Sequence, residues 1–228
     1  LFDGSADVLA GDVTKVPTGT ASSTVIAAAA VDPAVQMNGI AMLSWGGTTT
    51  GTQRRITSWA ATGVDAYFTP QAFTTTWPGS QATAVVAAEF ASGTSMSVWS
   101  RGGAGAAASG AYTTGTDHLW IGSGGDTAPW GHWMGSTSEI IVTNTTFTAA
   151  QRRVVEEYLA RKWGSLLTPA APGTPAATGG FGGATVTWSA PSWNGGAAVT
   201  SYTVTASPGG STCTSATTSC TFSGLAAG

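Results

Sequence analysis

Residues 131 to 164 read GHWMGSTSEIIVTNTTFTAAQRRVVEEYLARKWG. The middle of this stretch, Glu139 to Thr143, is a run of β-forming residues and predicts a strand. The remainder predicts a helix from Thr148 to Trp163. A strand that leads directly into a helix near residue 164 suggests that a domain is closed at this point.

The helix carries start and stop signals of its own. Thr148 and Gln151 have the spacing of a capping box, in which each side chain bonds the backbone N–H of the other residue. Gly164 is a typical C-terminal stop. We expect the apolar stripe of the helix to pack on the preceding domain; its residues are Val154, Val155, Tyr158 and Leu159.

Upstream of this stretch the chain consists of short β-type runs separated by Gly, Thr, Ser and Pro. Short strands with no helical period between them favour two packed antiparallel sheets. The expected fold class is therefore all-β, an antiparallel β-sandwich (jelly roll) with one C-terminal helix. The expected strands are Thr24 to Val31, Ile40 to Trp45, Arg55 to Trp59, Asp65 to Phe68, Ala84 to Phe90, Met96 to Ser100, His118 to Gly122 and Glu139 to Thr143.

Composition excludes several classes of protein. Only 8% of the residues are charged and the net charge is -3, so the chain lacks the clustered cations that bind nucleic acid. It has 10 Trp and is therefore unlike an ordinary disordered chain. No apolar run approaches the roughly 18 residues that cross a bilayer, so we expect no membrane insertion.

A second domain is expected after the helix. Residues 165 to 175 hold Pro169, Pro172 and Pro175, a composition typical of an extended linker. Residues 176 to 228 contain no charged residue and show the alternation of β-strands around a Gly-rich turn. The expected domains are thus 1–164, the linker 165–175, and a smaller β-domain over 176–228.

Both cysteines of the chain lie in this second domain. Cys213 and Cys220 flank a polar loop, and the simplest interpretation is a disulfide across a hairpin. Disulfides persist in oxidising compartments. We therefore expect an extracellular, cell-surface or virion location.

The segment from Trp120 to Gly164 resembles the end of bacterial concanavalin-A-like (laminin-G-type) jelly-roll domains, where a Gly-rich loop, an E-I-I-V strand and a helix ending in Y-L-x-x-K-W-G follow in this order. The opening LFDGSADVLA is similar to the first strand pair of that family, and TVIAAAAVDP followed by GIAMLSWGG is similar to its next two core strands. The resemblance covers about residues 1 to 164 and implies a jelly-roll fold.

The tail VTWSAPSWNGGAAVTSYTVTASPGG, followed by CTFSGLAAG, resembles a fibronectin type III domain of actinobacterial secreted proteins and of phage tail proteins. Such a domain continues into two more strands, whereas this sequence ends at Gly228. The resemblance therefore implies a smaller immunoglobulin-like sandwich over 176–228 that is truncated, and we expect either a fragment of a longer protein or completion by another chain.

Catalytic patterns are missing from the sequence. Hydrolases with this jelly roll use closely spaced carboxylates, but Glu89 and Glu139 have no acidic neighbour within several positions, and Glu156 and Glu157 lie on the helix. The sequence has no G-x-S-x-G elbow and no H-x-x-x-H pair. We expect no enzyme activity. No D-x-D-x-D-G run occurs either, so we expect no cofactor, with Ca2+ held by loop oxygens as the alternative.

One loop combines residue types that recognise sugars. Indole rings stack on the apolar faces of sugars while neighbouring polar side chains bond the hydroxyls. The Gly-rich segment Gly122 to Trp133 predicts a ligand site formed by Asp126, Trp130, His132 and Trp133. The alternative for each Trp is core packing, since the chain is rich in Ala; this alternative applies to Trp45, Trp59, Trp99, Trp120 and Trp133.

The cations are interpreted as surface residues. Arg54 and Arg55 point to opposite faces of a strand, so at most one of them can line a concave surface. We expect instead solvated edge residues that discourage strand addition. The helix cations are expected to form its wet face; they are Arg152, Arg153, Arg161 and Lys162.

These observations favour a non-catalytic binding and display module that contacts glycan or another cell-surface polymer. Two alternatives stay open at this point. The first is a purely structural subunit or decoration of a phage tail, capsid or surface fibre, which would bind other such subunits. The second is an accessory domain of a polysaccharide-degrading enzyme.

Overall fold

The computed structural model describes residues 2–3, 7–32, 38–47, 52–59, 63–68, 71–76, 83–103, 106–111, 113–124 and 132–225. Contacts between residues divide the chain into two compact units, Leu1–Leu167 and Thr168–Gly228. We refer to them as the first and second units and describe each by itself.

The first unit consists of two six-stranded sheets in which all paired strands are antiparallel. Sheet A has the order β1 (Phe2–Asp3), β12 (Met134–Thr143), β3 (Ser23–Val31), β8 (Ala84–Ala91), β9 (Ser95–Ser100) and β10 (Ala106–Ser109). Sheet B has the order β2 (Leu9–Ala10), β11 (His118–Ile121), β4 (Asn38–Gly46), β5 (Gln53–Trp59), β6 (Gly63–Phe68) and β7 (Gln71–Thr76). A short 3-10 helix, Val13–Lys15, follows β2.

The expected antiparallel β-sandwich with one helix is confirmed. Each of the eight predicted strands overlaps an observed strand. Four strands have no counterpart among these eight, namely β1, β2, β7 and β10; β1 and β2 lie in the segment LFDGSADVLA, which the family resemblance gives as a strand pair, although each pairs with another strand. Two of them have only two residues, and β7 and β10 consist mainly of Thr, Ala and Ser, which carry little hydrophobic alternation.

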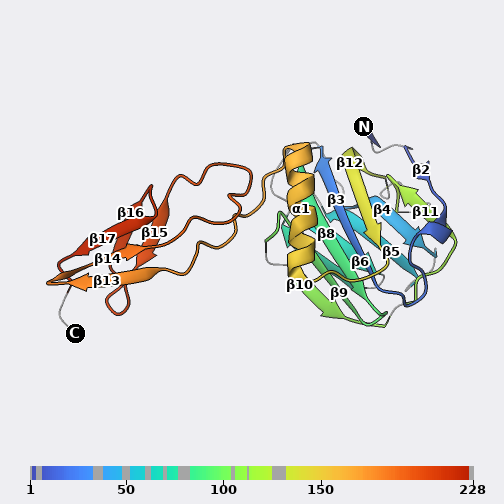
Figure 1. Ribbon diagram of the computed structural model, residues 1–228. Helices are drawn as coiled ribbons and strands as arrows, with labels where there is room; N and C mark the ends of the chain where they lie inside the picture. The colour runs from blue at the N-terminus through green and yellow to red at the C-terminus, as the bar shows by residue number, and fades with distance from the viewer. Residues whose placement is uncertain are drawn as a thin grey trace. The chain divides into compact units, whose positions relative to one another are not determined.

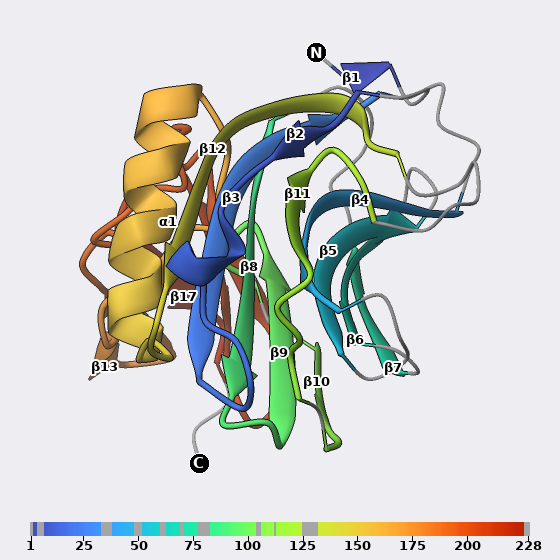
Figure 2. The same cartoon turned by 90° about the vertical axis from the view of Figure 1, so that its right-hand side faces the viewer.

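The central strands of sheet A, β3 and β8, are buried on both faces of the sheet. One face packs against sheet B around Trp45, Phe90 and Trp133, and the rings of Trp45 and Phe90 meet edge to face at 5.7 Å. The other face, with Ile26 and Val85, packs under helix α1. Because both faces are buried, β3 and β8 are nearly continuous apolar runs rather than alternating ones. Figure 2 shows α1 against one side of sheet A and sheet B on the other.

Helix α1 (Ala149–Trp163) begins and ends as the sequence predicts. The Thr148 hydroxyl accepts from the Gln151 N–H, the Gln151 side chain accepts from the Thr148 N–H, and Gly164 ends the helix at φ 67°. The predicted stripe is only half correct. Val155 and Leu159 pack on sheet A, whereas Val154 and Tyr158 are 68% and 46% exposed.

The second unit contains a three-stranded sheet and a two-stranded sheet, both antiparallel (Figure 1). The first has the order β13 (Ala176–Gly180), β14 (Gly183–Thr187) and β17 (Ser219–Ser223); the second pairs β15 (Tyr202–Thr205) with β16 (Thr212–Ser215). Trp188 contacts Tyr202 edge to face, with ring centroids 5.3 Å apart.

The predicted disulfide between Cys213 and Cys220 is present, but it does not cross a hairpin. Cys213 lies on β16, which pairs with β15, and Cys220 lies on β17, which pairs with β14. The bond therefore links the two sheets of the second unit. Spacing in sequence could not reveal this, because two strands that follow each other need not pair.

Replacing both cysteines with serine is expected to lower the free energy of unfolding of the second unit by about 2–3 kcal/mol, because the lost link closes a short loop in the unfolded chain. Limited proteolysis of the full chain, followed by mass spectrometry, would measure faster cleavage between Thr212 and Leu225. The first unit contains no cysteine and is the internal control. Unchanged cleavage in this segment would contradict the prediction.

Candidate functional site

Strand β5 sends two adjacent arginines to opposite faces of sheet B. The side chain of Arg54 is fully buried between the sheets, where Nη1 donates to Ser23 Oγ at 2.7 Å and Nη2 donates to Ala21 O at 2.6 Å. Its guanidinium lies 5.0 Å from the centroid of the Phe90 ring. The interpretation of Arg54 as a solvated edge residue is wrong, since β5 lies inside sheet B between β4 and β6.

Arg55 and Gln53 therefore belong to the outer face of sheet B, which faces away from sheet A. Strands β4, β5 and β6 curve so that this face is concave (Figure 2). The register places Trp120 of β11 opposite Ser44 of β4, and Ser44 opposite Arg55. Trp120 and Arg55 are both half-buried, about two strand spacings or ~10 Å apart.

An imidazole and an indole form a stacked pair on this face. The rings of His118 and Trp120 lie 3.8 Å apart between centroids, at an interplanar angle of 21°. His118 is buried and Gln53 Nε2 lies 3.0 Å from its Nε2. Because an amide nitrogen only donates, His118 Nε2 accepts, which fixes the ring orientation beneath the indole. The result is a rigid aromatic platform with Trp120 as its partly exposed member.

The loop after β11 is tied to the same face. Gln53 Nε2 also donates to Gly124 O at 2.6 Å, and Ser44 Oγ donates to Ser123 O at 2.6 Å. Gly124 packs close to Arg55, since a Cβ at this position would lie 2.9 Å from Arg55 Nη1. At the far end of the loop the backbone of His132 bridges to Ser123 and Ala41. The predicted ligand loop is thus anchored at both ends to this face of sheet B, and its first end lies beside Arg55.

The structure describes two of the four predicted ligand residues, His132 and Trp133, and places only His132 next to the outer face of sheet B. His132 is half-buried at the end of the loop, next to the outer face of sheet B. Trp133 is 1% exposed and belongs to the core between the sheets, so its indole offers no ring face to a ligand. Asp126 and Trp130 lie outside the described residues. Trp45 also packs in the core, in agreement with the alternative for the tryptophans.

Four residues of this face were not predicted as site residues: Gln53, Arg55, His118 and Trp120. A signal for them exists in the alternation of QRRIT and HLWI, which sends every second side chain to one face. The sequence does not show which face is outer, nor that β11 and β5 are both neighbours of β4. That pairing alone brings together positions 65 residues apart.

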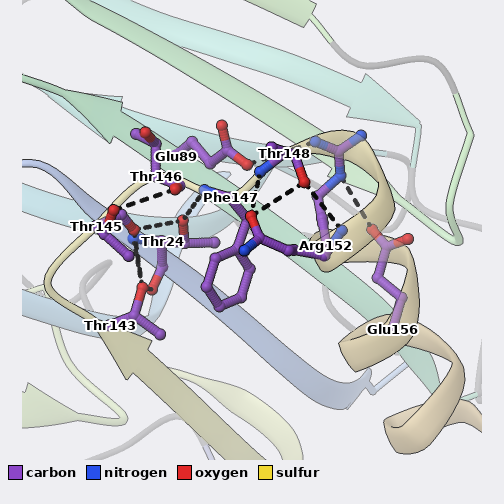
Figure 3. Close-up of polar contacts among 10 residues, drawn as sticks. Thr24, Glu89, Thr143, Thr145, Thr146, Phe147, Thr148, Arg152 and Glu156 are labelled. Carbon is purple, nitrogen blue, oxygen red and sulfur yellow. Dashed lines mark hydrogen bonds and ion pairs between the residues drawn. The ribbon is translucent and has the colours of Figure 1, made fainter.

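The helix cations are not all wet. Arg152 is 15% exposed at its side chain, and its guanidinium carbon lies 3.7 Å from the centroid of the Trp99 ring. Its Nη1 is 3.4 Å from Glu89 Oε1 on β8, and its Nε is 3.6 Å from Glu156 Oε1 (Figure 3). The expectation of a solvated face is wrong for Arg152, which joins two carboxylates that the sequence placed far apart.

A second polar cluster lies on the outer side of α1. Glu139 Oε2 accepts from Lys162 Nζ and from Trp163 Nε1, both at 2.9 Å, and Glu139 Oε1 accepts from Tyr158 at 3.3 Å. These hydrogen bonds, that from Lys162 foremost, lower the pKa of Glu139. The cluster explains why Tyr158 and Trp163 sit at the surface rather than in the core.

Among the described residues no group of three or more His, Cys, Asp or Glu side chains is placed to hold a metal ion. In the same part of the chain, no helix has the length and apolar character required to span a bilayer.

Comparisons with known proteins place the first unit among β-sandwiches. No family model and no curated protein matches the sequence. Among solved structures, the CBM40 of the Ruminococcus gnavus IT-sialidase has a TM-score of 0.50 and 15% identity, over 67% of this chain and 95% of that one. The likeness at this identity shows a shared fold.

Two further structures are similar. The same CBM40 bound to alpha2,3 sialyllactose has a TM-score of 0.48 and 16% identity, over 60% of this chain and 83% of that one. A mutant of Trypanosoma rangeli sialidase with trans-sialidase activity has a TM-score of 0.48 and 14% identity, over 70% of this chain and 30% of that one.

Proposed function

We propose that the first unit is a non-catalytic glycan-binding module whose site lies on the outer face of sheet B. The observation that carries this proposal is the His118–Trp120 stack, in which Trp120 is half-buried and lies about two strand spacings, or ~10 Å, from the half-buried Arg55 on the same face. An indole supplies a stacking surface for a sugar ring, and a guanidinium donates in a fixed fork to hydroxyl or carboxylate oxygens. His132 and the predicted loop residues Asp126 and Trp130 complete the proposed site.

The hydrogen bonds that hold the His118–Trp120 platform in place support a glycan-binding site on this face. Gln53 and Ser44 hold His118 and the start of the loop through bonds that are themselves buried. A ligand would then meet a fixed ring and a fixed loop end, and little ordering would oppose binding.

We further propose that the module is displayed outside the cell, on a cell surface or on a virion. The disulfide of the second unit favours an oxidising compartment. In this proposal the second unit, with its resemblance to a fibronectin type III domain, separates the glycan-binding unit from its anchor.

The Trp120→Ala variant is expected to bind glycan at least tenfold more weakly, because it removes the stacking surface; a loss of this size corresponds to about 1.4 kcal/mol. Titration calorimetry would compare sialyllactose, the ligand in the CBM40 complex, with lactose, which lacks the carboxylate. The Arg55→Ala variant should lose more affinity for the acidic sugar than for the neutral one.

Trp163→Ala is the matched control, because Trp163 is also a partly exposed tryptophan but lies on α1. Its affinity should equal that of the wild type. If no saccharide binds the wild-type chain on an array of acidic and neutral glycans, or if Trp120→Ala binds as well as wild type, the proposed site is refuted.

A further inference from the structure

Glu156 is a buried residue of helix α1, and its side chain is only 3% exposed. The residue is 2% exposed and stands beside Leu159 and Ala160, which pack on sheet A. A carboxylate in such a position requires a nearby cation, because removing an ionised group from water is unfavourable.

The cation that approaches Glu156 is shared. Arg152 Nε is 3.6 Å from Glu156 Oε1, while Arg152 Nη1 is 3.4 Å from Glu89 Oε1. Both distances exceed that of a short charge-assisted hydrogen bond. The guanidinium also covers the ring of Trp99 on β9, which fixes its plane. Figure 3 shows Arg152 between Glu89 and Glu156 at the first turns of the helix.

Two carboxylates thus share one guanidinium, and the other charged residues around Glu156 do not supply a second cation for it. Arg153 comes near its carboxyl group on the side of Gly102, but Arg153 Nε is 2.9 Å from Glu157, and Glu157 also pairs with Arg161 at 3.7 Å. Arg101, in the turn after β9, donates to Leu166 O. Burial raises the pKa of Glu156 to about 7, because its effect is larger than the opposing attraction of Arg152 and Arg153. Burial also raises the pKa of Glu89.

We propose that α1 is held to the sandwich by a proton-dependent latch: the helix is fully docked when Glu156 carries a proton, and ionisation of Glu156 in neutral to alkaline solution loosens it. The sign follows from linkage. A carboxyl that is harder to ionise in the folded chain contributes stability that is complete below about pH 4.5 and is lost as pH rises through about 7. The latch thus favours docking in mildly acidic surroundings.

The E156Q variant tests the latch, because glutamine resembles the protonated acid at every pH. Scanning calorimetry of the full chain should find the thermal midpoint of the first unit near that of wild type at pH 5 and higher by about 5 °C at pH 8. The E139Q variant is the control, because Glu139 is paired with Lys162 and hydrogen bonds lower its pKa, so that it is ionised at both pH values. This change should lower the midpoint equally at pH 5 and pH 8.

A titration of the wild-type chain tests the same idea without any substitution. The NMR shift of the Glu156 carboxyl carbon should change with a midpoint near pH 7, and the E89Q variant should lower that midpoint, because Arg152 would then serve Glu156 alone. Hydrogen exchange, corrected for intrinsic rates, should show that α1 loses protection at pH 8 while β4 does not. A midpoint near 4.5, or an E156Q variant that is less stable than wild type at pH 8, would overturn the proposal.

Discussion

An Arg54→Ala variant is expected to lose about 3–5 kcal/mol of the free energy of unfolding of the first unit. The substitution leaves the oxygens of Ser23 and Ala21 buried without their donor, and each unsatisfied group costs about 1–3 kcal/mol. It also opens a cavity next to the Trp45 and Phe90 rings that the guanidinium now contacts. Urea unfolding followed by circular dichroism would measure the loss.

Arg55→Ala is the natural control, because the two arginines are adjacent on β5 but point to opposite faces. We expect it to change stability by less than about 1 kcal/mol, as for other partly exposed positions, while it weakens glycan binding. Arg54→Lys should be intermediate, since an ammonium group cannot reproduce the fork of two donors. An Arg54→Ala variant within about 1 kcal/mol of wild type would show that the buried guanidinium contributes little.

The features predicted correctly from sequence depend on neighbours along the chain. The capping box joins Thr148 to Gln151, and the strand alternation joins each residue to the next but one; both are visible in a short window. The apolar stripe of α1 was only half correct, because a helical period gives a face but not its width. Tyr158 lies at the surface, where its hydroxyl donates to Glu139, 19 residues away.

The roles that sequence missed depend on contacts between distant segments. Arg54 is buried because Ser23 and Ala21, more than 30 residues earlier, supply oxygens for it. Arg152 is buried because Glu89, 63 residues away on β8, lies under the helix. The sequence of a cation-rich helix predicts a solvent-exposed face, and only the position of β8 shows that one of its cations is buried. In the same way, Trp120 and Arg55 lie on one face of sheet B only through their common neighbour β4.

The second large effect concerns Arg152, and its size should depend on pH. At pH 8 we expect Arg152→Ala to destabilise the first unit by about 3–4 kcal/mol, because Glu89 and Glu156 would then be buried without the cation that they share. At pH 5 Glu156 is protonated under the latch proposal, and the loss should fall to about 1–2 kcal/mol, from the contact with Trp99 and the pair with Glu89. Urea unfolding at the two pH values would measure the difference.

Arg161→Ala separates this effect from a general loss of helix charge. Its side chain is 64% exposed and pairs with Glu157 at 3.7 Å, so its removal should cost no more than about 0.5 kcal/mol at either pH. If Arg152→Ala causes an equal loss at pH 5 and pH 8, Arg152 is a structural link between α1 and sheet A. Its contribution then does not depend on the protonation of Glu156. A loss below about 1 kcal/mol at both values would mean that the apolar contacts of Val155 and Leu159 hold the helix without it.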